Sequence, residues 1–90
     1  MPGASVEADR SMMEMKIAAT AGLTRVTFEP GGVVFTLDAG EFITLQLDPS
    51  LAPSVEINIW PNGISVWLPY PGESDYIVLD SGNDELARLW

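Results

Sequence analysis

Two pairs of acidic residues are the side chains of this sequence that come nearest to an acid–base arrangement. Asp38 precedes Glu41 by three positions, and Glu73 precedes Asp75 by two. Two carboxylates held together in a cleft can act as general acid and general base. Both pairs stand at predicted turns, where acidic residues are common, and a chain of 90 residues is expected to form no sizeable cleft. We therefore predict no catalytic residues.

The composition excludes most other catalytic chemistry. The chain contains no His and no Cys, and Lys16 is its only lysine. Catalysis by Ser–His–Asp or Cys–His groups, and metal binding by thiolate or imidazole, need side chains that this chain lacks. We predict that the protein is not an enzyme and that it uses no cofactor.

One segment, DSGNDE at residues 80–85, gathers oxygen ligands as a calcium-binding loop does. It lacks the spacing of an EF-hand, which places a Gly at position six and a bidentate Glu at position twelve of the loop. Residues of the same types also cap the start of a helix. We therefore predict a helix start here and no metal site.

Net charge is the most unusual property of the chain. Thirteen Asp and Glu stand against four Lys and Arg, so the formal net charge is −9. Nucleic acids and anionic membranes are bound through cations, and we predict that the chain binds neither directly. Its field would instead attract a basic protein partner. An acidic surface can also serve solubility alone.

A more specific alternative is that the carboxylates imitate nucleic acid phosphates and occupy a nucleic-acid-binding protein. That would require the acidic residues to share one face of the fold. Most of them fall at turns, and Glu56 alone is expected in the middle of a strand.

The stretch NIWPNGISVWLP, residues 58–69, predicts a β-hairpin with one tryptophan on each strand. If Asn62–Gly63 forms a two-residue turn, Trp60 and Trp67 share one face and the aliphatic residues share the other. If Pro61 begins a type I turn and the following glycine forms a bulge, Trp67 joins the isoleucines and Trp60 alone stays free. Segregation of apolar residues favours the first register, and the preset backbone of proline slightly favours the second.

Exposed aromatic residues beside acidic ones are typical of protein interfaces. Phe42 and Tyr76 are further candidates for exposed rings, unless a second layer or a C-terminal helix covers them. The residues that we predict for partner binding are Glu56, Asn58, Trp60, Trp67, Tyr70, Glu73 and Asp75.

The remaining pattern is that of β-structure. Short runs rich in β-branched and aromatic residues alternate with Gly, Pro, Asn and Asp turns. The connections are too short for parallel crossovers, so successive strands are expected to pair antiparallel. The predicted fold class is all-β: an antiparallel meander of six to seven short strands, closed as a small barrel or folded as a two-layer sandwich. The expected strands are 23–28, 33–37, 41–47, 55–60, 64–68 and 75–79, with a seventh near 13–19, where a helix start is the alternative.

Alternation within these runs also assigns the core, because successive side chains of a strand point to opposite faces. The predicted core residues are Val33, Phe35, Leu37, Ile43, Leu45, Leu47, Val55, Ile57, Ile59, Ile64, Val66 and Leu68.

The last ten residues, SGNDELARLW, change period. Ser81 or Asn83 fits a helix N-cap, and Leu86, Leu89 and Trp90 fall on one stripe of a helix. We predict a short C-terminal helix that covers an open end of the β-structure.

For the chain as a whole, residues 1–11 are expected to form a flexible N-terminal leader and residues 12–90 a single β domain. No apolar run approaches the roughly 18 residues of a membrane span. The N-terminus lacks the features of an export signal. We therefore expect a cytoplasmic protein without membrane contact.

Together these features predict a small acidic protein-binding or inhibitory module, of the immunity-protein, antitoxin or anti-defence kind, that acts on a basic partner. The alternative is a structural or assembly subunit that associates with itself through sheet faces or edge strands, with a homodimer as its simplest form.

Overall fold

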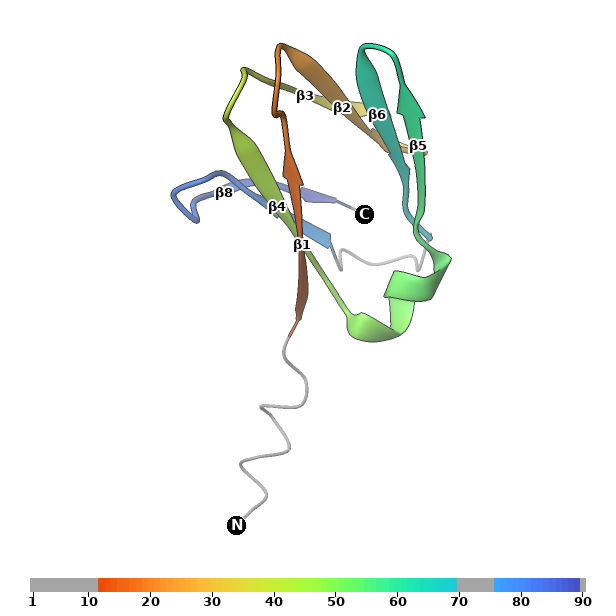
Figure 1. Cartoon of the computed structure of the whole chain (residues 1–90). Coiled ribbons are helices and arrows are strands. Elements are labelled where there is room, and N and C mark those ends of the chain that lie inside the picture. The colour runs from red at the N-terminus through yellow and green to blue at the C-terminus, as the bar shows by residue number, and fades with distance from the viewer. Residues whose placement is uncertain (1–11, 70–75, 90) are drawn as a thin grey trace.

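The protein folds as two four-stranded β-sheets, as the computed structural model shows for residues 12–69 and 76–89 (Figure 1). Sheet A has the strand order β1-β4-β7-β8, and sheet B has the order β3-β2-β6-β5. The strands of sheet A are β1 (Met13–Ala18), β4 (Phe42–Leu47), β7 (Tyr76–Leu79) and β8 (Glu85–Leu89). Those of sheet B are β3 (Val33–Leu37), β2 (Thr24–Glu29), β6 (Gly63–Trp67) and β5 (Glu56–Trp60). A 3₁₀ helix, η1 (Pro49–Ser54), connects β4 to β5.

The core lies between the two sheets and takes side chains from both. Val26 and Phe28 of β2 and Val66 of β6 are fully buried from sheet B, and Leu45 and Val78 are fully buried from sheet A. The two-layer sandwich is therefore the arrangement that forms, and the expected all-β class is confirmed.

The predicted core is mostly confirmed. Alternation along β4 correctly buries Ile43, Leu45 and Leu47. Ile57 and Ile59 of β5 are the exceptions: their side chains are 46% and 81% exposed. A strand pattern reveals which side chains share a face, but the extent of the opposing sheet decides which of them are covered.

The prediction of a meander was wrong. Strand β2 pairs with β6 in parallel, with Val26 opposite Ile64 and Phe28 opposite Val66. Short connections do not force neighbouring strands to pair, because β1 and β2, β3 and β4, and β6 and β7 belong to different sheets. Among the described strands, only β2–β3, β5–β6 and β7–β8 are hairpins within one sheet.

The prediction of a C-terminal helix was also wrong, because residues Glu85–Leu89 form strand β8 instead. This strand brings the count in the described residues to eight, where six or seven were expected. Strand β8 pairs antiparallel with β7, with Leu89 opposite Tyr76. Leu89 is buried, whereas Leu86 is 45% exposed, so the two leucines do not form one stripe. The spacing of the apolar residues is compatible with a helix and with a strand. The segment forms a strand because it pairs with the edge that β7 would otherwise leave open.

The ambiguous segment near the N-terminus forms strand β1, as expected from its alternation. It pairs with β4 along its whole length, from Met13 opposite Leu47 to Ala18 opposite Phe42. The predicted leader, residues 1–11, lies outside the described residues.

Candidate interaction surface

The β5–β6 hairpin adopts a register that differs from both predicted ones. Trp60 pairs with Gly63 and Asn58 with Ser65, so Pro61 and Asn62 form the two-residue connection. Gly63 belongs to strand β6 and not to the turn. A Cβ atom at this position would lie 2.8 Å from the backbone oxygen of Arg25, a distance that side chains do not tolerate. The close approach of β2 therefore fixes the register by requiring glycine inside the strand.

This register places both tryptophans on the same face, as the first of the two predicted alternatives does. Trp60 is 58% exposed and Trp67 is 46% exposed. The register pairs Glu56 with Trp67 and Asn58 with Ser65, so these polar residues share the tryptophan face. Ile57 and Ile59 point to the opposite face, together with Ile64 and Val66 of β6. We call the side of the hairpin that carries Glu56, Asn58, Trp60, Ser65 and Trp67 the tryptophan face.

The two rings lie at opposite ends of this face. Trp60 stands four positions from Glu56, the partner of Trp67, which corresponds to roughly 13 Å along the strand. Between them the Trp60 Nε1–H donates a hydrogen bond to Ser65 Oγ at 3.1 Å. That bond fixes the orientation of the indole of Trp60 while leaving most of its surface open.

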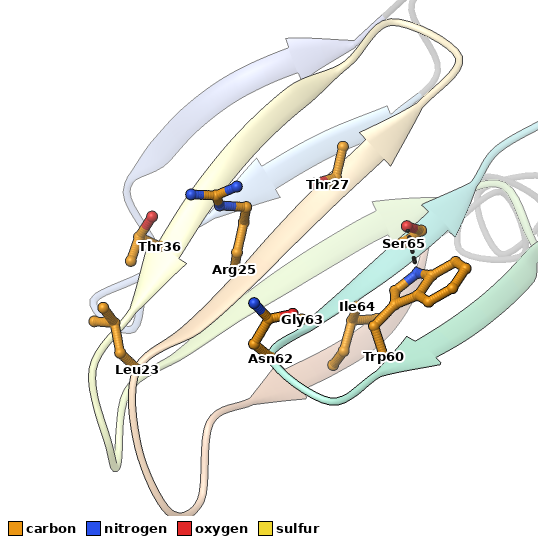
Figure 2. Close-up of a pocket in the computed structure, with 9 residues that line it drawn as sticks. All are labelled: Leu23, Arg25, Thr27, Thr36, Trp60, Asn62, Gly63, Ile64 and Ser65. Carbon is orange, nitrogen blue, oxygen red and sulfur yellow. Dashed lines mark hydrogen bonds between the residues drawn. The ribbon is translucent and has the colours of Figure 1, made fainter.

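An open groove of about 380 Å³ adjoins Trp60 on the outer side of sheet B (Figure 2). Arg25 and Thr36 stand on one side of it, and Trp60 and Ser65 stand on the other. The complete lining is Leu23, Arg25, Thr27, Thr36, Trp60, Asn62, Gly63, Ile64 and Ser65.

Arg25 is the cation of this outer surface. Of the other cations in the described residues, Arg88 bonds Glu85 at 2.8 Å and Lys16 lies 4.2 Å from the ring centre of Phe42. Both lie in sheet A. Among the described residues, the outer side of sheet B thus combines two tryptophans, several hydroxyl groups and charges of both signs, rather than an array of carboxylates.

Of the residues predicted for partner binding, the structure brings four together on the tryptophan face: Glu56, Asn58, Trp60 and Trp67. The other three, Tyr70, Glu73 and Asp75, lie outside the described residues. Sequence analysis missed Arg25, Thr27 and Thr36. Alternation places the first two on the polar side of β2, but only the parallel pairing of β2 with β6 shows that they adjoin the hairpin.

Two further aromatic candidates are placed elsewhere. Tyr76 was expected among the exposed rings, but it is fully buried, and its hydroxyl donates a hydrogen bond to the backbone oxygen of Pro69 at 2.6 Å. Phe42 is half-buried on sheet A, where Lys16 lies over its ring.

The carboxylates considered for chemistry serve local turns where the structure describes them. Glu41 Oε1 accepts a hydrogen bond from the Asp38 N–H at 2.7 Å, and Gly40 has φ +87° in the same turn. Asp80 Oδ1 accepts from the N–H groups of Gly82 and Asp84 at 2.8 and 2.9 Å. The Glu73–Asp75 pair lies outside the described residues.

In residues 12–69 and 76–89, no three His, Cys, Asp or Glu side chains come together as metal ligands would. Within the same residues, no helix has the length and apolar character needed to span a bilayer. Comparisons with protein-family models, with curated proteins and with solved structures find no match to this chain.

Proposed function

We propose that this protein is a small, non-catalytic protein-binding module whose contact surface is the tryptophan face of the β5–β6 hairpin. The observation that carries the proposal is the exposure of Trp60 and Trp67 on a single face, 58% and 46% respectively. Tryptophan is among the residues that contribute most to binding energy when an interface covers them. The paired strands fix the backbone positions of both residues, and the hydrogen bond to Ser65 orients the Trp60 indole, which reduces the entropy lost in the complex.

The partner that suits this surface is a basic protein. A net charge of −9 creates a field that steers positively charged proteins toward the chain and repels nucleic acids. Glu56 supplies one carboxylate beside Trp67 within the tryptophan face. An inhibitor of a basic enzyme or toxin, of the immunity-protein or antitoxin kind and acting in the cytoplasm, is the form of this function that we favour.

The proposal is tested by substituting the exposed rings. Proteins retained by the immobilised full chain are identified, the strongest basic partner is purified, and its Kd is measured by calorimetry. Because a tryptophan that an interface buries can contribute about 2 kcal/mol or more, we expect Trp67→Ala to weaken binding by roughly 30-fold. The Kd of the unchanged protein should rise with salt between about 0.05 M and 0.5 M, since charges steer the encounter.

Leu86→Ala is the matched control. Leu86 is 45% exposed on strand β8 of sheet A, so this substitution removes exposed apolar surface at a place outside the hairpin. Its Kd should stay within about twofold of the unchanged protein. If Trp60→Ala and Trp67→Ala both bind the partner as well as Leu86→Ala does, the tryptophan face is not the contact surface.

A further inference from the structure

Strand β5 is an open edge of sheet B with little of the usual protection against pairing. Figure 1 shows it outermost in its sheet, beside β6. Natural edge strands are commonly protected by charged side chains, above all Lys, by Pro or by a bulge. The sequence of β5, EINIW, has neither Lys nor Pro, its pairing with β6 is regular, and its one charge, Glu56, stands at its first position. It exposes Ile57, Ile59 and Trp60. By contrast, the edge strand β1 carries Lys16, and the edge strand β8 pairs irregularly with β7 and carries Arg88. The other edge of sheet B, β3, also has no charge or Pro, but Val34 is its one large apolar side chain among the exposed ones.

The hydrogen bonds of β6 reveal which backbone groups of β5 face the open edge. Asn62 accepts from the Arg25 N–H, and Leu68 donates to the Glu29 carbonyl, so the even-numbered residues of β6 bond to β2. The odd-numbered residues therefore face β5, where they pair with Glu56, Asn58 and Trp60. The N–H and C=O groups of the intervening Ile57 and Ile59 consequently point away from β6.

We propose that two copies of this chain pair antiparallel through their β5 strands and form one continuous eight-stranded sheet. In an antiparallel pair, residues whose backbone groups face the partner must stand opposite one another. A two-fold axis at Asn58 meets this condition, since it places Ile57 opposite Ile59 of the second copy and pairs the strand along its whole length. A register centred on Ile59 would place Pro61, which has no N–H, opposite Ile57.

The side chains suit this register on both faces. Ile57 and Ile59 of the two copies, four isoleucines in all, gather on the side of the sheet that faces sheet A. Their contact covers the isoleucine surface that sheet A leaves exposed. On the other side Glu56 stands opposite Trp60 of the second copy, and Asn58 stands opposite its own counterpart. The two Glu56 carboxylates, the only charges on β5, are separated by about 13 Å along the strand, beyond the roughly 8 Å range of unscreened repulsion.

The dimer is expected to be of moderate affinity. A standard stable interface covers about 800 Å² on each partner, and a single edge of five residues covers less. The net charge of −9 on each copy also opposes association at low salt. We therefore expect a micromolar Kd that falls as salt rises, opposite to the salt dependence of the basic partner. The dimer proposal does not depend on the proposed basic partner, because it is tested with the purified protein alone.

Sedimentation velocity from about 5 to about 500 µM protein measures the association. We expect a monomer–dimer equilibrium in which Ile59→Lys weakens the dimer at least tenfold, because a charge enters the isoleucine cluster. Val34→Lys is the matched control: it makes the same charge change at an exposed residue on β3, the opposite edge of sheet B. A monomer at all concentrations in both low and high salt overturns the proposal, as does an equal effect of the two substitutions.

A second experiment uses the absence of cysteine from the chain. In the proposed register the two Asn58 residues form a pair without mutual hydrogen bonds, in which Cα atoms lie about 4.5 Å apart, within the range for a disulfide. Asn58→Cys should therefore cross-link two chains under mild oxidation much faster than Thr36→Cys, which places the thiol on the exposed outer side of β3. Equal rates for the two variants would show that β5 does not pair about Asn58.

Discussion

Gly63 shows how a single atom can determine where two tryptophans lie. The backbone of β2 passes so close to this residue that a Cβ would meet the Arg25 oxygen at 2.8 Å. Glycine is therefore held inside strand β6, and the turn moves back by one residue to Pro61–Asn62. The consequence is that both tryptophans share a face, although the Asn–Gly pair normally forms the turn itself.

Replacing Gly63 by alanine should destabilise the protein by about 1–3 kcal/mol, the usual cost of inserting a methyl group into a tightly packed place. Urea unfolding followed by tryptophan fluorescence measures the change. Gly22→Ala is the control, because a Cβ there meets no atom within 4 Å, and its effect should stay within about 0.5 kcal/mol. Equal stability of the two variants would mean that the backbone of β2 does not pass close enough to Gly63 to exclude a methyl group.

At the scale of elements, alternation in the sequence was a reliable guide and helical spacing was not. In β2 and β3 the more buried side chains alternate with less buried ones, so their inward faces could be predicted without any partner strand. In β4 the aliphatic residues Ile43, Leu45 and Leu47 are buried as alternation predicts, although Thr44 between them is buried as well. Leu86 and Leu89 fit a helical stripe equally well, because three positions also separate residues on opposite faces of a strand. The pairing of Leu89 with Tyr76 in the β7–β8 hairpin decided the element, and the spacing of the leucines alone does not reveal that pairing.

The strand at the C-terminus predicts unequal roles for its two leucines. Leu89→Ala should cost about 2–5 kcal/mol, since Leu89 is 4% exposed within the core. Leu86→Ala, at a side chain that is 45% exposed, should cost less than about 1 kcal/mol. Thermal or urea unfolding distinguishes the two, and similar losses would indicate the helical stripe that we first expected.

At the scale of the whole molecule, the order of the strands is what the sequence could not reveal. Which sheet a strand joins depends on contacts between segments distant in the chain, and short connections are compatible with both a meander and a sandwich. Arg25, Thr27 and Thr36 therefore appeared unrelated to the hairpin until β2 was found beside β6. The tryptophan face itself was partly predictable, because Glu56, Asn58, Trp60 and Trp67 all belong to one local hairpin.

The parallel pairing of β2 with β6 also bears on how the chain reaches this structure. The hairpins β2–β3, β5–β6 and β7–β8 join neighbours in sequence, but Arg25 and Gly63 must meet across more than thirty intervening residues. Closing a loop of that length costs entropy before any contact repays it. We expect the three hairpins to form early and the β2–β6 pairing late, so that refolding takes milliseconds to seconds despite the small size of the chain. Stopped-flow refolding from urea measures this rate, and complete refolding within microseconds would show that the distant pairing does not limit it.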